Sequence, residues 1–396
     1  MQALVKNLKS NKLFWVLAIA LLVRAVVIVL LPDQHFPDAG AYRAAAEKLR
    51  QLHLMTDNVI MPLYPLLIAL VGDDWGLRLA DAAFSLISVW LVYAITLRIY
   101  RDETIALIAG FFCAIWPHFA FFAAAGLTET LFITLVLAAF LCCYDRRYAL
   151  ASVFLVLGIL TRPAIDFLAP ILIALFSIGV HRESLKVAGK RVATYLIVYV
   201  VLMAPWWVHN YARYGEFVRL DLAGGMVLYT GNNPLNKSGG GITAKDVDFS
   251  DLPDSKFPVQ RNQAALHAAI KFIKADPWRF VAMMPVKFAR LWRPWPYTDE
   301  YHSALIVLVS VISAVPTFIL ALTGLALTLR SHFFRLLPCL AYVAYLTLVH
   351  VVTFGSVRYR VPLEPFVLIV AAAGLVELLR RVEPGRQLLA PLSSTR

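Results

Sequence analysis

Long apolar runs separated by short polar segments occupy most of the 396 residues of this chain. A helix needs about 20 apolar residues to cross the hydrocarbon core of a bilayer. Runs close to that length cover residues 13–31, 78–97, 104–122, 126–143, 191–208, 303–329, 336–354 and 361–379. Because a backbone that faces lipid must satisfy its own hydrogen bonds, each of these runs is expected to be a helix.

The apolar segment from Ala149 to Val180 requires separate treatment. Its 32 residues would form a helix about 48 Å long, which exceeds one crossing, and the sequence LTRPAID interrupts it. We predict that the segment divides into two helices between Thr161 and Pro163. The chain is then an all-α polytopic membrane protein with about ten spans.

Lysine and arginine residues in the short loops predict the orientation of these spans. They concentrate in every second loop, and such loops stay on the cytoplasmic side. The residues that carry this signal are Lys6, Lys9, Lys12, Arg98, Arg101, Arg146, Arg147, Arg182, Arg191, Arg330, Arg335, Arg380 and Arg386. We therefore predict that both termini are cytoplasmic and that the irregular loops lie on the outer face. An undivided segment at LTRPAID would place two basic loops on opposite faces.

Composition supports a membrane protein and argues against several other classes. Hydrophobic residues make up 60% of the chain and charged residues only 16%, more apolar surface than one soluble core can bury. The net charge of +12 comes in good part from the cytoplasmic loops, so nucleic-acid binding is not supported. The four cysteines fall in or at the ends of spans and imply no disulfide framework. The N-terminus resembles a signal peptide, but its apolar run is nearer to span length.

Three regions follow from this pattern. Residues 1–208 form an N-terminal transmembrane module, and its first outer loop, 32–77, carries a short helix around Asp38. Residues 209–302 form an outer, periplasmic region. Its first half alternates like strands between Gly and Asn turns, and its second half resembles helices that lie on a membrane surface. We therefore expect a small mixed outer region, followed by C-terminal transmembrane helices and a cytoplasmic tail over 303–396.

Two acidic residues on the outer face could carry chemistry. Asp38 could be a general base or a metal ligand, or simply the N-cap of the short helix that follows it. Glu129, in LTETLF, lies near the start of a span, where a carboxylate is costly and is a functional hypothesis by default. The alternative for Glu129 is a capping role together with Thr128.

Arginines on the same face break the expected charge pattern. Arg358 and Arg360 flank Tyr359 in SVRYR, and two guanidinium groups there suit a phosphate at the membrane surface. The alternative is that their heads simply reach the polar interface. Arg162 poses the same choice, and we add Tyr42 to the residues expected to bind donor phosphate or lipid.

Other polar residues in the apolar part of the chain receive structural predictions. Arg24, inside the first span, is expected to pair with a carboxylate of a neighbouring helix. His118, His209 and His302 lack ligand spacing to one another, so we expect structural roles for them. No phosphate-binding loop, dinucleotide fingerprint or zinc motif is present, and the metal requirement stays open, with a divalent cation as one option.

Several segments, in order along the chain, resemble one known superfamily. These are FPDAGAYRAAAEKL, PLYPLLIALVG, LTETLF, LTRP, APWWVHNYARYGEFV, DPWRFVAMMPVKFARLW and GSVRYRVPLEPFVLIVAA. The sequence resembles the GT-C superfamily of integral membrane glycosyltransferases, in the bacterial branch related to protein O-mannosyltransferases and the lipid A aminoarabinose transferase. Asp38 is followed by Ala39, whereas eukaryotic protein mannosyltransferases carry an Asp-Glu pair there.

The resemblance implies an inverting glycosyltransferase of the bacterial inner membrane, with its active site on the periplasmic side. The donor would be a polyprenyl-phosphate-linked sugar and the acceptor a glycan, a lipid or a protein. Asp38 would be the base or an essential carboxylate, Glu129 would match the second acidic position, and the arginines of RYR would lie near the donor phosphate.

A transporter or flippase for a lipid-linked sugar is the alternative function. That class predicts polar residues along the middle of several spans, whereas most mid-span residues here are Leu, Ala, Val and Phe. A non-catalytic scaffold gives no reason for carboxylates and arginines to gather on the outer face.

Overall fold

The computed structural model describes residues 12–30, 36–55, 59–241, 246–295 and 304–382. Within these ranges the chain is helical and contains no strand, which confirms the all-α class. Five of the described helices are long and apolar enough to cross a membrane, and four shorter ones are also apolar. The five are α2 (Lys12–Leu30), α5 (Asp74–Tyr100), α11 (Leu185–Tyr214), α15 (Ala304–Val352) and the segment Val357–Arg380, which contains α16, η4 and α17.

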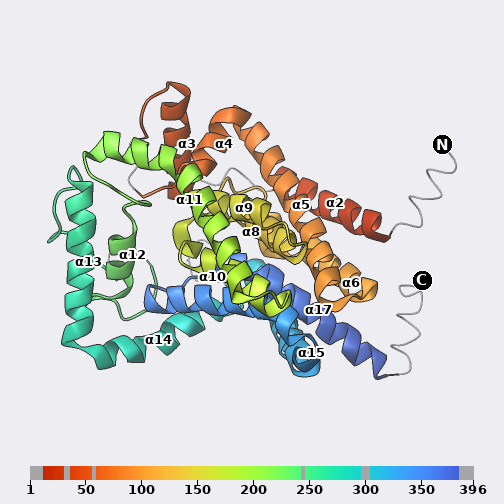
Figure 1. The fold of residues 1–396 in the computed structure, drawn as a ribbon. Coiled ribbons are helices and arrows are strands. Elements are labelled where there is room, and N and C mark those ends of the chain that lie inside the picture. The colour runs from red at the N-terminus through yellow and green to blue at the C-terminus, as the bar shows by residue number, and fades with distance from the viewer. Residues whose placement is uncertain (1–11, 31–35, 56–58, 242–245, 296–303, 383–396) are drawn as a thin grey trace.

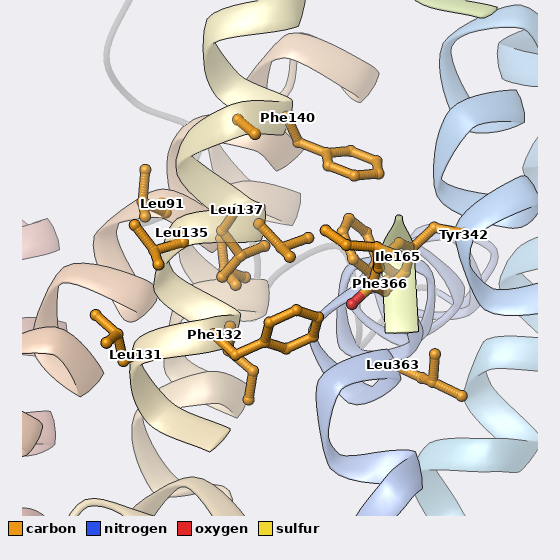
Figure 2. Close-up of a cluster of buried hydrophobic side chains, with 14 of the residues drawn as sticks. Leu91, Leu131, Phe132, Leu135, Leu137, Phe140, Ile165, Tyr342, Leu363 and Phe366 are labelled. Atoms are coloured by element: carbon orange, nitrogen blue, oxygen red, sulfur yellow. The ribbon is translucent and has the colours of Figure 1, made fainter. Parts of the chain in front are cut away.

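The core forms around a helix that is buried on almost every side. This is α8 (Glu129–Tyr144), which packs against α5 and α9 (Tyr148–Thr161). Figure 2 shows its Phe132 and Phe140 directed toward Tyr342 and Phe366, which come from helices late in the chain. The ring centroids of Phe140 and Phe366 are 4.6 Å apart. Aromatic packing therefore joins α8 to helices that lie about 200 residues later in the sequence.

The division at LTRPAID is confirmed. Helix α9 ends at Thr161, a single 3-10 turn (η1, Pro163–Ile165) follows, and the chain continues as α10 (Leu168–Ala174) and a π-helical turn (η2, Leu175–Val180). Pro163 disfavours a helical conformation in the residue before it. Arg162 accordingly has an extended backbone, with φ −148° and ψ 119°.

The last long helix, α15, differs from the expectation of two spans joined by a basic loop. Its 49 residues are helical throughout. Its two halves nevertheless contact the same short segment, because Phe318 lies 5.2 Å from the guanidinium of Arg360 and His350 stacks on Tyr359 at 4.4 Å. A straight helix would separate Phe318 and His350 by about 48 Å. Helix α15 therefore folds back on itself, and the expected loop is a helical turn.

Basic loops distant in sequence meet at one end of the bundle. Arg98 pairs with Asp145 at 2.8 Å, and Arg146 pairs with Glu183 at 3.1 Å. Arg335, at the turn of α15, donates to the carbonyl oxygen of Ile99 at 3.1 Å. We call this the basic end, and we call the opposite end, which carries α3 (Pro37–Arg50) and α16 (Val357–Arg360), the site end. Basic loops that were predicted to share one side of the membrane therefore lie at the same end of the helix bundle.

The region between α11 and α15 is helical where strands were expected. It contains α12 (Gly224–Gly231), α13 (Pro258–Ala275) and α14 (Pro277–Trp292), which lie together on one side of the bundle (Figure 1). The amide nitrogens of three buried asparagines, Asn232, Asn233 and Asn236, donate to nearby backbone carbonyls. Such local bonds replace a strand ladder, so the prediction of a mixed region is wrong for the described part. His302 lies outside the described residues.

Candidate active site

Asp38 lies in the first turn of α3 and does not cap that helix. The N-cap position is Phe36, and no side chain makes a capping bond there. The Oδ2 atom of Asp38 instead accepts a hydrogen bond from Nη1 of Arg358 at 2.5 Å. The side chain of Asp38 is 52% exposed, so this carboxylate is paired yet open to solvent.

Glu129 is the first residue of α8, and its side chain is fully buried. Its Oε1 atom accepts from Nε of Arg358 and from Nη1 of Arg162, the latter at 2.5 Å. No side-chain capping bond is made at this helix start, so the capping alternative with Thr128 is not supported. A buried carboxylate must be paired to stay charged, and two guanidinium groups supply that pairing.

Arg358 joins the two carboxylates. It donates to Asp38 through Nη1 and to Glu129 through Nε, and 28% of its side chain remains exposed. The two carboxylates offset the cost of partly burying this guanidinium, because each accepts a charge-assisted hydrogen bond from it. The guanidinium is therefore a fixed positive charge at a point that solvent can reach.

Aromatic residues surround this network. The guanidinium of Arg162 lies 5.7 Å from the ring centroid of Tyr359, and His350 stacks on the same ring. Tyr42, one helical turn after Asp38, packs edge-on against Tyr64 with centroids 5.4 Å apart. Burial first, and the charge of Glu129 second, raise the pKa of Tyr42. The structure thus brings together six of the predicted residues, which are Asp38, Tyr42, Glu129, Arg162, Arg358 and Tyr359.

Arg360 is the predicted site residue that the structure places elsewhere. Its side chain is fully buried, and its Nε donates to Oε1 of Glu364 at 2.8 Å. Its Nη1 donates to the carbonyl oxygens of Leu291 and Arg293, at the C-terminal end of α14. Arg360 therefore hydrogen-bonds the last carbonyl groups of α14 and does not lie beside Arg358 as a second phosphate ligand. Its position two residues after Arg358 turns its side chain away from the site.

Sequence reasoning missed the carboxylate that holds Arg360. Glu364 is buried, and besides Arg360 it accepts from Nε1 of Trp116 at 2.5 Å and contacts Nδ1 of His118 at 2.9 Å. This Arg360–Glu364 cluster connects α7 (Pro117–Phe122), α14 and the start of α17 (Glu364–Arg380). The four-residue spacing of Arg360 and Glu364 in the sequence could have indicated this ion pair, because residues four apart are neighbours on a helix.

Two further polar groups lie inside spans. Asp81 is fully buried, and its Oδ2 accepts from the Tyr64 hydroxyl at 2.7 Å. Its Oδ1 has no hydrogen-bond partner among the described residues. Asp81 was missed because it lies within an apolar run. Arg24 was expected to pair with a carboxylate, and that prediction is wrong: it donates to the carbonyl oxygens of Cys113 and Ala114, at the end of α6 (Glu103–Ile115), and to Oγ of Ser85.

The carboxylates of the network do not fit a divalent cation as they stand. Within the described residues, no three His, Cys, Asp or Glu side chains form a group that could hold a metal ion. Asp38 and Glu129 share one guanidinium, so a cation between them would have to displace Arg358 from a charge-assisted pair.

The arrangement has the chemistry of an anion site beside a base. An exposed carboxylate can accept a proton from a hydroxyl group. A guanidinium held at its side binds phosphate oxygens well, because its N–H donors match their geometry. Glu129 holds the two arginines in place, and because it is buried, water does not compete with these pairs.

Comparison with solved structures shows which proteins have a similar fold. The archaeal oligosaccharyltransferase AglB from Archaeoglobus fulgidus, in complex with an inhibitory peptide and a dolichol-phosphate, aligns with a TM-score of 0.58 and 13% identity. The alignment covers 98% of this chain and 53% of AglB. ArnT from Cupriavidus metallidurans, bound to undecaprenyl phosphate, aligns with a TM-score of 0.55 and 16% identity, over 96% of this chain and 62% of ArnT.

These alignments decide the fold. The chain has the fold of AglB and ArnT. This likeness confirms the fold that the GT-C resemblance implies. The chain spans about half to three fifths of the length of these two proteins. No family model matches the sequence, and no curated protein matches it.

Proposed function

We propose that this chain is a membrane glycosyltransferase that moves a sugar from a polyprenyl-phosphate-linked donor to a hydroxyl group of an acceptor. The observation that carries the proposal is the partly exposed guanidinium of Arg358, held between an exposed carboxylate and a buried one. The likeness to AglB and ArnT, whose structures contain polyprenyl phosphates, supports the same donor class.

Each residue of the network receives a role. Arg358 binds the phosphate of the donor and stabilises the charge that develops on it as the sugar leaves. Arg162 adds a second positive charge, and Glu129 holds both arginines in place. Asp38 accepts the proton of the attacking hydroxyl group. Tyr42 and Tyr359 line the site and position donor or lipid.

The stereochemical outcome follows from a single displacement. The acceptor oxygen attacks the anomeric carbon from the face opposite the phosphate, the bond between carbon and phosphate oxygen breaks, and the electron pair stays on the phosphate. The configuration at the anomeric carbon is inverted. The acceptor can be a glycan, a lipid or a protein, and we place the site on the periplasmic side of a bacterial inner membrane with both termini in the cytoplasm.

Mass spectrometry of cell-surface glycans and lipids tests the proposal. Cells with and without this protein should differ by the mass of one sugar on one class of acceptor. Cells that carry Asp38→Asn should match the cells that lack the protein, although the variant inserts and folds. A full complement of the sugar in cells with Asp38→Asn would rule out Asp38 as the base.

A transporter or flippase is separated by the fate of the donor. A transferase releases free polyprenyl phosphate only when an acceptor is present, whereas a flippase releases none. Release of free polyprenyl phosphate by purified protein in detergent therefore distinguishes the two functions.

A further inference from the structure

The two carboxylates on Arg358 are held very differently. Glu129 is fully buried and accepts hydrogen bonds from two arginines. Breaking these pairs would leave an uncompensated buried charge, which is strongly unfavourable. Asp38 is half exposed and, among the described residues, accepts one hydrogen bond, from Nη1 of Arg358. Exposed ion pairs are weak because water and salt compete with them. Of the two partners of Arg358, Asp38 is the one that an incoming anion can replace.

We propose that Asp38 and the donor phosphate compete for Nη1 of Arg358, so that binding of the donor releases the base. This inference rests on the proposed function. Before the donor binds, Oδ2 of the Asp38 carboxylate is held by the guanidinium of Arg358 and does not face an acceptor hydroxyl group. A phosphate oxygen takes its place on Nη1, and Arg358 keeps an anion on each side. The freed carboxylate then accepts the proton of the acceptor hydroxyl group.

The position of Asp38 in α3 stabilises its carboxylate when that carboxylate no longer pairs with Arg358. It lies in the first turn of a 14-residue helix whose N-cap makes no side-chain bond. The N-terminal end of a helix carries partial positive charge and unpaired N–H groups, which stabilise a nearby carboxylate. The start of α3 thus remains a favourable place for this carboxylate when Arg358 no longer holds it. A rotation of its side chain suffices for the exchange, and the backbone of α3 need not move.

The proton of the acceptor and the electron pair of the broken bond each have a destination in this arrangement. The acceptor O–H bond breaks and its proton goes to Asp38, the new carbon–oxygen bond forms, and the leaving phosphate keeps the electron pair. Asp38 then loses the proton to solvent. As the polyprenyl phosphate departs, the carboxylate returns to Nη1 of Arg358.

Binding of undecaprenyl phosphate, without sugar or acceptor, tests the exchange. The protein is placed in phosphatidylcholine nanodiscs as wild type, Asp38→Asn, Arg358→Gln and the double variant, and Kd is measured. Loss of the competing carboxylate should tighten binding about two- to fivefold in Asp38→Asn, the range expected from an exposed ion pair. Arg358→Gln should weaken binding about tenfold or more. In the double variant, the gain from Asp38→Asn should disappear.

Two controls make the outcomes distinct. Asp74→Asn removes an exposed carboxylate that pairs with another arginine, Arg43, at 2.8 Å, and it should leave Kd unchanged. Phosphatidylglycerol and inorganic phosphate serve as competitors, to separate a general anion effect from recognition of the polyprenyl phosphate.

Each result either supports or overturns the exchange. If Arg358→Gln weakens binding but Asp38→Asn leaves it equal or weaker, the exchange is wrong and the proposed donor site stands. If Arg358→Gln leaves binding unchanged, the donor site itself is wrong, and the exchange falls with it. A gain from Asp38→Asn that persists in the double variant would also overturn the exchange, because the competition would not involve Arg358. Thermal melting of each variant confirms that folded proteins are compared.

Discussion

Arg358 and Arg360 are two residues apart in one four-residue helix, yet they belong to different parts of the molecule. Arg358 is 28% exposed and joins Asp38 to Glu129. Arg360 is fully buried and joins Glu364 to the end of α14. Residues at this spacing face different sides of a helix. The difference teaches that one arginine of RYR is open to solvent and pairs with two carboxylates, whereas the other is buried and holds helices together.

The largest effect is expected from removing the exposed arginine. Arg358→Gln should lower kcat/KM about 10²- to 10³-fold, because it removes the charge that stabilises the leaving phosphate. Arg358→Lys should restore only part of the rate, since a single ammonium cannot reproduce the fork of donors. Sugar transfer by the purified variants gives the measurement. A rate within about threefold of wild type in Arg358→Gln would contradict the assignment.

Removing the buried arginine should affect stability instead. Arg360→Gln leaves Glu364 with fewer partners in a dry site, and breaking a buried ion pair costs about 3–5 kcal/mol. The free energy of unfolding, from denaturant titration in detergent, should fall by that amount. The KM for the donor should stay near the wild-type value in the protein that remains folded. A large rise in KM without loss of stability would show that Arg360 does bind the donor.

Lys287 extends the comparison to a buried cation for which the described part of the chain supplies amide and carbonyl oxygens in place of a carboxylate. Its Nζ donates to Oδ1 of Asn232 at 2.9 Å and to the carbonyl oxygen of Val352 at 3.3 Å. Burial lowers the pKa of Lys287 from 10.5 to about 8. Between these two pH values the unfolded chain binds more protons than the folded protein. The free energy of unfolding therefore rises with pH across this window, by about 1.4 kcal/mol per pH unit at most from this group.

Melting temperatures at pH 7.5, 9 and 10 check this sign, with Lys287→Met as the reference. The difference in stability between wild type and Lys287→Met should shift in favour of wild type as the pH rises. Parallel curves for the two proteins would mean that the pKa of Lys287 is not lowered by burial.

The smallest effect is expected on the stability of Asp38→Asn. Its exposed pair with Arg358 should contribute no more than about 1 kcal/mol, even though the same substitution removes transfer. The melting temperature of Asp38→Asn should therefore lie close to that of wild type. A loss as large as that of Arg360→Gln would place Asp38 with the packing residues.

Hydropathy alone predicts most of the helices, because lipid leaves a spanning backbone few alternatives. The break at Pro163 also follows from local sterics. The helical turn of α15 does not, since basic residues mark a loop without fixing its backbone. The same holds for α12, where buried asparagine amides bond to local carbonyls in a segment that alternates like strands.

The candidate site was predictable in part for a comparable reason. Charges near apolar runs identify Asp38, Glu129 and Arg358, because a charge at that depth needs an explanation. Which way Arg360 faces depends on where a short helix begins, and the sequence does not determine that point. Glu364 and Asp81 lie inside or beside apolar runs, where only their three-dimensional partners reveal them.

Release of free undecaprenyl phosphate tests the central claim most directly. Purified wild type, Asp38→Asn and Arg358→Gln are incubated with a pool of undecaprenyl-phosphate-linked sugars and a membrane extract as acceptor, and the released lipid is quantified by mass spectrometry. Wild type should release the lipid only when acceptor is added, and both variants should release about a hundredth of that amount or less. Undiminished release by Asp38→Asn and Arg358→Gln would contradict the account.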